Sequence, residues 1–244
     1  MLRSLQSQRV RRLRNLFSNS EPDQTEYGIF GRETVQNALN AGVVSEILYT
    51  PQSGACLCGG TLVTPEVLSF ITGDREREVA AVCRVRENAF VKEDPKRVLL
   101  LDHVRLQTNV GKILKIAFLL GVDVIIIDPE DEIRLFTHTV AECSGGALFY
   151  YPVQKRDLKE ALCSYRREGF FCVGTSLGQS VPLSGVSAKE KMLFVMGNER
   201  NGVSEELLSE CDVRCRIEMD HYDSLNVAVA TAILLHRFCR TGEL

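Results

Sequence analysis

The sequence has no stretch of apolar residues long enough to cross a lipid bilayer. A membrane-spanning helix needs about 20 consecutive apolar residues, and no run among the 244 residues approaches that length. Hydrophobic residues make up 45% of the chain and charged residues 25%. This composition is typical of a globular protein with one large domain or two smaller ones. We therefore expect a soluble protein with no membrane partner.

Two common nucleotide-binding motifs are also missing. No GxGxxG follows the first predicted strand of the second half of the chain, and no GxxxxGK[ST] occurs anywhere. Because these glycine-rich turns hold the phosphates of dinucleotides and nucleoside triphosphates, their absence argues against a dinucleotide oxidoreductase and against a P-loop nucleotide hydrolase.

The chain has little net charge. Its 29 lysines and arginines nearly balance its 32 aspartates and glutamates, which leaves a formal charge of −3 at pH 7. The overall field therefore does not indicate a nucleic-acid partner. A near-neutral balance does not exclude RNA either, and any RNA contact would have to come from a local basic patch.

A zinc-binding pattern is absent although the chain has nine cysteines. The two close pairs, Cys56 with Cys58 and Cys211 with Cys215, lack the paired CxxC and histidine arrangement of a zinc site. An odd number of cysteines, several of them inside apolar runs, is typical of reduced thiols in a reducing compartment. We expect no metal centre and a cytoplasmic protein.

The first twenty residues carry five arginines and no acidic residue. Apolar residues recur among them at roughly helical spacing, so three interpretations compete: an organelle transit peptide, an RNA-contacting helix, or the solvated face of a helix packed on the protein body. Helical and strand patterns resume directly after a polar turn at residues 18–24, so we favour an integral helix, with organelle import as the alternative. The arginines are Arg3, Arg9, Arg11, Arg12 and Arg14.

A domain boundary is predicted between residues 91 and 92. Charged stretches flank an apolar strand at residues 79–85, and the run at residues 88–95 resembles a linker. The expected domains are therefore an N-terminal RNA-binding or substrate-binding domain, 1–91, and a second domain, 92–244.

The second domain alternates between strands and helices, as in a parallel α/β sheet. Asn109, Asp157 and Ser224 are candidate helix N-caps, and Gly121 is a candidate stop. Strands are predicted at residues 97–102, 122–127, 170–174, 193–196 and 213–217, and helices at about 110–120, 157–168 and 224–240.

A glycine-bounded loop, Gly197 to Gly202, follows the strand at residues 191–196. Glycines there let the backbone approach a small molecule without a Cβ in the way. Glu199 lies between them. A carboxylate between two glycines of a loop is unexpected unless it binds another group. The pattern predicts a binding site.

These segments resemble the SpoU (TrmH) branch of the SPOUT RNA methyltransferases. Residues 193–203 resemble motif 2, a hydrophobic strand followed by G-x-E-x-x-G. Residues 217–219 and 224–230 resemble motif 3, and residues 109–111 with Lys115 fall where motif 1 carries N-x-G-x-x-x-R. The resemblance covers residues 96–244. More loosely, the first forty residues resemble the small substrate-binding module of the family's ribosomal-RNA members.

The resemblance implies a fold, an activity and a site. The fold would be α/β, with a C-terminal SPOUT trefoil-knot domain built on a parallel sheet and a small N-terminal α/β substrate-binding domain. The activity would be S-adenosylmethionine-dependent RNA ribose 2′-O-methylation, on rRNA rather than tRNA, by a homodimer. The implied cofactor-binding residues are Thr175, Met196, Gly197, Ile217, Met219 and Leu225. The implied catalytic residues are Asn109, Lys115, Glu199, Ser224 and Asn226.

Motif 1 departs from the family pattern. Lys115 stands where relatives carry an arginine, and Leu106 and Gln107 replace the usual acidic residue and proline. Arginine offers a planar fork that can bridge phosphate and hydroxyl, whereas lysine is a single flexible charge. A desolvated lysine could act as a base if its pKa fell. The alternative function is therefore a catalytically impaired SPOUT-fold RNA-binding or ribosome-assembly protein, in which Lys115 is only solvated and Asn109 only caps a helix.

Overall fold

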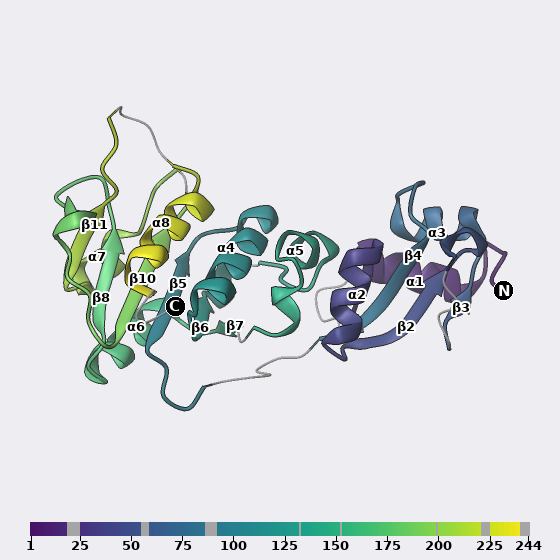
Figure 1. The fold of residues 1–244 in the computed structure, drawn as a ribbon, viewed down its shortest axis with the longest axis horizontal. Helices are drawn as coiled ribbons and strands as arrows, with labels where there is room; N and C mark the ends of the chain where they lie inside the picture. The colour runs from purple at the N-terminus through teal and green to yellow at the C-terminus, as the bar shows by residue number, and fades with distance from the viewer. Residues whose placement is uncertain are drawn as a thin grey trace. The chain divides into compact units, whose positions relative to one another are not determined.

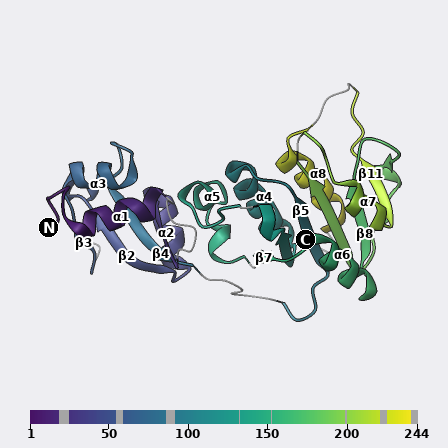
Figure 2. The same cartoon turned by 180° about the vertical axis from the view of Figure 1, so that it is seen from behind.

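The computed structural model describes residues 1–18, 25–54, 59–85, 92–131, 133–151, 153–198, 200–220 and 225–239. Internal contacts divide the chain into two compact units. The first comprises Met1–Arg86 and Arg134–Tyr150, and the second comprises Glu87–Ile133 and Tyr151–Leu244. Figure 1 shows the fold coloured by residue number, and Figure 2 shows it from behind. The predicted boundary after residue 91 stays a prediction, since residues 86–91 lie outside the described part of the chain.

The first unit contains the strands β1 (Glu26–Phe30), β2 (Val44–Tyr49), β3 (Thr61–Leu62) and β4 (Val79–Arg84). They form one sheet in the order β1-β4-β2-β3. β4 runs antiparallel to both of its neighbours, and β3 pairs parallel with β2. A bulge between Val44 and Glu46 shifts the register of β2 against β4.

Helices α1 (Gln8–Ser18), α2 (Arg32–Asn40) and α3 (Pro65–Thr72) complete this sheet domain, with a 3₁₀ turn at Pro51–Ser53. One face of α1 is apolar, and its buried residues Val10, Leu13 and Phe17 pack into the core of the unit. Burying such a side chain contributes roughly 1.5–3 kcal/mol. The N-terminal basic helix is therefore part of the folded unit.

Residues 134–150 belong to this first unit, although they were predicted to lie in the second domain. They form α5 (His138–Cys143) and a 3₁₀ turn at Ala147–Phe149. The His138 ring stacks on Phe30 of β1, with ring centroids 3.5 Å apart, and the Phe30 amide donates to His138 Nδ1 at 3.4 Å. Such contacts join residues about a hundred positions apart, which local sequence patterns do not report.

The second unit contains a seven-stranded sheet in the order β7-β6-β5-β10-β8-β11-β9, and every neighbouring pair is parallel. The strands are β5 (Arg97–Asp102), β6 (Val124–Ile127), β7 (Val153–Lys155), β8 (Phe171–Thr175), β9 (Val181–Pro182), β10 (Met192–Gly197) and β11 (Val213–Arg216). Strands β5, β6, β8, β10 and β11 correspond to the five predicted ones.

Four helices cover the two faces of this sheet: α4 (Gln107–Leu120), α6 (Leu158–Arg167), α7 (Glu205–Glu210) and α8 (Val227–Cys239). Side chains alternate between the faces of a strand. Accordingly, alternate residues of the central strands pack with α6 and α7 in one core cluster. They are Val98, Leu100, Val124, Ile126, Leu193 and Val195. On α8, Phe238 stacks on Phe194 of β10, with ring centroids 5.7 Å apart. Short 3₁₀ turns lie at Pro129–Asp131 and Leu183–Gly185.

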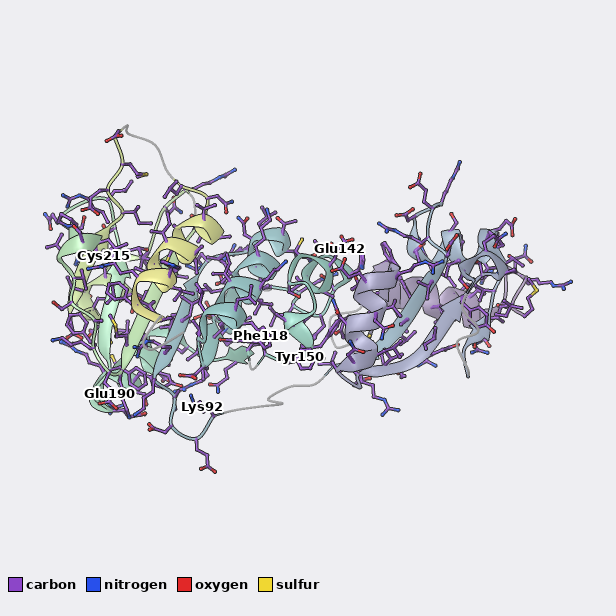
Figure 3. The ribbon with its side chains drawn as sticks, in the orientation of Figure 1. Lys92, Phe118, Glu142, Tyr150, Glu190 and Cys215 are labelled. Atoms are coloured by element: carbon purple, nitrogen blue, oxygen red, sulfur yellow. The ribbon has the colours of Figure 1, made fainter. Side chains whose placement is uncertain are left out.

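Two predicted helix ends are confirmed. Asp157 caps α6, since its Oδ1 accepts from the Glu160 amide at 2.7 Å. Gly121 ends α4 in the left-handed conformation, with φ of 76°, which costs glycine little. Five residues before β5 begins, Lys92, labelled in Figure 3, forms an ion pair with Asp123, with its Nζ 2.8 Å from Asp123 Oδ1. In the described part of the chain, no helix has the length and apolar character needed to span a membrane.

Candidate active site

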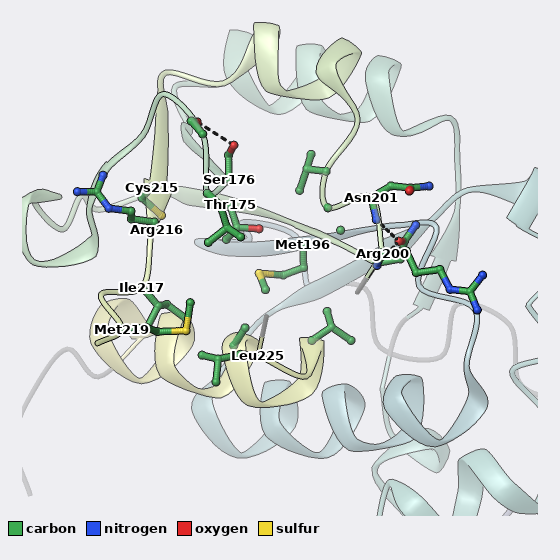
Figure 4. A pocket seen from close by; sticks show the side chains of 18 residues that line it. Thr175, Ser176, Met196, Arg200, Asn201, Cys215, Arg216, Ile217, Met219 and Leu225 are labelled. Atoms are coloured by element: carbon green, nitrogen blue, oxygen red, sulfur yellow. Dashed lines mark hydrogen bonds between the residues drawn. The ribbon is translucent and has the colours of Figure 1, made fainter. Parts of the chain in front are cut away.

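A cavity of about 520 Å³ lies at the carboxyl ends of β8, β10 and β11. The carboxyl edge of a parallel sheet is where α/β proteins ordinarily bind ligands. All six residues predicted to bind the cofactor line this cavity, so four separate sequence segments meet there (Figure 4). The six are Thr175, Met196, Gly197, Ile217, Met219 and Leu225. Their role toward a cofactor stays a prediction.

The cavity wall has an apolar side and a polar side. Met196 is buried at the end of β10, and it faces the centre of the cavity together with Ile217 and Leu225 (Figure 4). The polar side is formed by the loop that carries Asn198 and Asn201. A volume of 300–1,000 Å³ with mostly apolar walls and a few polar groups is typical of small-molecule sites. These features fit S-adenosylmethionine, which combines a flat adenine with a polar tail.

The loop after β10 closes on itself. Gly202 donates its amide to the Asn198 carbonyl at 3.0 Å, and Asn198 Oδ1 accepts from the amides of Arg200 at 2.9 Å and Asn201 at 2.8 Å. Gly202 has a φ of 68°, a conformation that a side chain disfavours. A Cβ on Gly197 would overlap the backbone of Gly202 and Val203.

This geometry changes the predicted role of the two glycines. They were expected to let the backbone approach a ligand, but the group that would meet a Gly197 side chain is the loop's own backbone. Gly197 is therefore needed first to close the loop. The loop in turn shapes one wall of the cavity.

A buried aspartate of β5 supports the same loop. Asp102 pairs in register with Gly197 of β10, and its Oδ2 accepts from the Ser204 amide at 2.6 Å. Helix α7 begins at Glu205, directly after Ser204, and the Ser204 side chain makes no capping hydrogen bond. The Ser204 amide is instead satisfied by the carboxylate of Asp102. Sequence reasoning did not identify Asp102, because its partner lies 102 positions away.

A second cluster missed by sequence reasoning follows β5. The buried Asp131 accepts from the His103 amide at 3.1 Å, and the two groups His103 Nδ1 and Asp131 Oδ1 lie 2.6 Å apart. Arg105 Nε donates to the same oxygen at 3.2 Å. His103 Nε2 lies 3.6 Å from Asp102 Oδ1. The hydrogen bond to Asp131 raises the pKa of His103 above its ordinary value, so a positively charged ring is favoured. His103 has a positive φ of 55°, and the sequence does not reveal this conformation.

Two of the predicted catalytic residues meet in the structure. Asn226 Nδ2 donates to Asn109 Oδ1 at 3.1 Å, and Asn226 Oδ1 accepts from the Ala228 amide at 3.0 Å. Asn109 was a candidate N-cap of α4, but the helix begins at Gln107 and Asn109 is buried within it. Instead of capping its own helix, Asn109 bonds to the residue that caps α8.

Of the other three predicted catalytic residues, the structure describes only Lys115. Lys115 is exposed on α4 and does not line the cavity. An α-helix turns once in about 3.6 residues, so a residue six positions after Asn109 lies on a different face. Glu199 and Ser224 lie outside the described residues. The roles of all five residues stay predictions.

Comparison with known proteins places this site in a family. The model of the SpoU rRNA methylase family matches residues 96–236, which is more than half of the chain. The 23S rRNA (guanosine(2553)-2′-O)-methyltransferase RlmP of Bacillus subtilis is 28% identical, over 96% of this chain and 97% of its own.

Solved structures give the same result. An AdoMet-bound rRNA methyltransferase from Sinorhizobium meliloti has a TM-score of 0.81 and 26% identity, over 96% of this chain and 95% of its own. The SpoU methyltransferase AviRb from Streptomyces viridochromogenes, in complex with AdoMet, has a TM-score of 0.82 at 20% identity, over 96% of this chain and 98% of its own, and shares the fold. The predicted fold class, a SPOUT trefoil-knot domain with a parallel sheet and a small N-terminal α/β domain, is confirmed. The chain belongs to the SpoU rRNA methylase family and is an S-adenosylmethionine-dependent RNA 2′-O-methyltransferase.

Proposed function

We propose that this enzyme methylates ribosomal RNA rather than tRNA. The observation that carries the proposal is the extent of the match to RlmP, a 23S rRNA enzyme, which covers 96% of this chain and therefore reaches into the N-terminal unit. The N-terminal unit would supply the RNA-binding surface that directs the methyltransferase unit to its substrate.

The arginines of the N-terminal helix are not equivalent as RNA contacts. Arg9 Nη2 lies 2.5 Å from Glu46 Oε1, and Arg12 Nη2 lies 3.2 Å from Glu26 Oε2. Arg14 Nη1 donates to the Phe70 carbonyl at 2.6 Å. These three arginines therefore also hold the unit together. Arg3 and Arg11 are exposed, and we assign the phosphate contacts to them first.

In the cavity, we assign the apolar side chains Met196, Ile217 and Leu225 to the adenine of the cofactor. Bound S-adenosylmethionine supplies a methyl group on a sulfonium. The protein's task is to place a ribose 2′-hydroxyl in line with that methyl and to stabilise or remove its proton, so positioning carries much of the rate. We assign the proton to Lys115 because it occupies the arginine position of motif 1, although it does not line the cavity. We assign a positioning role to the pair Asn109 and Asn226, which ties α4 to the start of α8.

We also propose that the enzyme is a homodimer through α4 and α8. Leu119 of α4 is 70% exposed, and on α8 Val229 and Ile233, one helical turn apart, are 48% and 39% exposed. Helices α4 and α8 contact each other, and large exposed apolar groups on neighbouring helices are typical of an association surface. The variant Ile233→Asp should sediment as a monomer where the parent sediments as a dimer. A monomeric parent would contradict this proposal.

The substrate is tested by methyl transfer from labelled S-adenosylmethionine. Total RNA is prepared from cells that lack the enzyme, and rRNA and tRNA are separated before incubation. Incorporation is expected in rRNA, at a single ribose that primer extension or mass spectrometry can map. RNA from cells that contain the enzyme is the control, because its site is already methylated and should accept little label. Labelling confined to tRNA would overturn the rRNA assignment.

A further inference from the structure

Two arginines supply the positive charge among the described residues that line the cavity. They are Arg200, in the loop after β10, and Arg216, at the end of β11. Arg216 is partly buried and its Nη1 donates to the Ser180 carbonyl. Its guanidinium is therefore used within the protein. Arg105, four residues before Asn109 of motif 1, does not line the cavity and is held by the buried Asp131.

Arg200 differs from these arginines in having a fixed backbone and an unengaged side chain. Its amide donates to Asn198 Oδ1 at 2.9 Å, inside the closed loop described above. Its side chain is exposed, and within the described residues its guanidinium pairs with no carboxylate or carbonyl. In Figure 4 it extends from the rim of the cavity away from Met196 and Leu225. The loop thus presents a planar cationic fork outward from the mouth of the cavity.

An RNA substrate places a phosphate next to this position. In a polynucleotide, the 2′-hydroxyl that accepts the methyl group is on the carbon next to the one that carries the 3′-phosphodiester. A ribose that presents its 2′-hydroxyl to the cavity therefore brings a phosphate to the rim. A guanidinium binds such a group through two parallel hydrogen bonds, which fixes orientation as well as distance.

We propose that Arg200 binds the phosphodiester adjacent to the target ribose and thereby positions the 2′-hydroxyl for methyl transfer. Arg200 then supplies the planar fork that motif 1 lacks in this chain, where Lys115 replaces the arginine. This inference rests on methyl transfer to RNA at this cavity, and it is independent of whether the RNA is ribosomal. The outward direction of the side chain distinguishes this role from a contact with the carboxylate of the cofactor.

The test compares Arg200→Gln and Arg200→Lys with the parent on one unmethylated RNA that the parent methylates. The glutamine variant should lower kcat/KM for RNA by about 10-fold or more, the value of one charge-assisted contact. It should leave the affinity for S-adenosylmethionine, measured by calorimetry, unchanged. The lysine variant keeps the charge without the fork and should recover only part of the loss. Arg167→Gln is the matched control, since Arg167 is an exposed arginine on α6 and does not line the cavity.

Three outcomes would overturn the proposal. They are an unchanged kcat/KM for RNA in Arg200→Gln, an equal loss in Arg167→Gln, or a loss confined to cofactor affinity. If the parent transfers no methyl group to any RNA, the enzymatic function itself fails. Arg200 is then tested by RNA affinity in the presence of S-adenosylhomocysteine, where Arg200→Gln should bind about 10-fold more weakly and an unchanged affinity would overturn the proposal. Circular dichroism of each variant shows whether the fold is retained.

Discussion

Asn226 and Asn109 are joined by a side-chain hydrogen bond of 3.1 Å across 117 positions of sequence. The same Asn226 side chain accepts from the Ala228 amide and so caps α8. One residue therefore ties the helix of motif 1 to the helix of motif 3, directly beside Leu225 in the cavity wall.

Replacing this asparagine should destabilise the second unit. Asn226→Ala removes a helix cap, worth about 0.5–2 kcal/mol, and a hydrogen bond to the buried Asn109, worth roughly 1 kcal/mol. We expect urea unfolding to report a loss of about 1–3 kcal/mol. Because Asn109→Ala breaks the same bond, the double variant should lose less than the sum of the single losses. Additive losses would show that the two side chains are not coupled.

Gly197 offers a direct test of the loop. In Gly197→Ala the new Cβ would overlap the backbone of Gly202 and Val203, so the loop must open and the cavity wall must move. Calorimetry should then show at least a 10-fold loss of S-adenosylmethionine affinity. Gly185→Ala is the control, since nothing lies within 4 Å of a Cβ there, and it should bind normally. Parent-like affinity in Gly197→Ala would contradict the assignment of this loop to the cofactor.

How far the sequence alone predicts this structure depends on the range of the interactions. The bounds of β5 and the Asp157 cap follow from residues within a few positions of one another, and both predictions are confirmed. The segment at residues 134–150 was assigned to the wrong neighbours, because its packing depends on Phe30.

The candidate site shows the same division. The glycine loop and the motif 3 segment are recognisable as local patterns, and the structure brings both to one cavity. By contrast, the support from Asp102 and from the pair His103 and Asp131 involves partners 28 to 102 positions apart. A buried carboxylate has no local pattern of its own, so sequence reasoning could not find it.

The N-terminal arginines should contribute unequally to RNA affinity. The exposed Arg3 and Arg11 are expected to contact phosphate, so replacing each by Gln should flatten the dependence of log affinity on log salt by about 0.7–0.9 per contact. Arg9→Gln, which breaks the ion pair with Glu46, should change thermal stability more than the salt slope. Equal salt slopes for the parent and for the Arg3 and Arg11 variants would favour a helix face that is only solvated.

Two histidines should make stability depend on pH in opposite directions. Asp131 raises the pKa of His103, with a smaller contribution from Asp102, and Arg105 opposes it. The stabilising charge of His103 is therefore fully present below its ordinary pKa of 6.5 and is lost as the pH rises through the raised value. The difference in unfolding free energy between the parent and His103→Gln should shrink from pH 6 to pH 9. A constant difference would contradict a charged His103.

For His138, burial lowers the pKa below its ordinary value of 6.5. Its Nδ1 accepts from the Phe30 amide, so the neutral ring is the stable form. Its contribution is present above pH 6.5 and is lost as the pH falls through the lowered value. The first unit should lose stability on mild acidification, and His138→Gln should reduce that loss. Nuclear magnetic resonance titration of the imidazole resonances would report both pKa values directly.

Lys115 carries the last prediction, because it separates proton handling from phosphate binding. If Lys115 stabilises or removes the proton of the 2′-hydroxyl, Lys115→Ala should lower kcat by ~10²–10⁴. Cofactor affinity should remain, because Lys115 does not line the cavity. Lys115→Arg should retain or raise activity, since it restores the residue usual in the family. Lys112→Ala is the matched control, because Lys112 is also exposed and lies about one helical turn before Lys115. Undiminished methylation by Lys115→Ala would remove this role from Lys115, and a loss in Lys112→Ala alone would transfer it to Lys112.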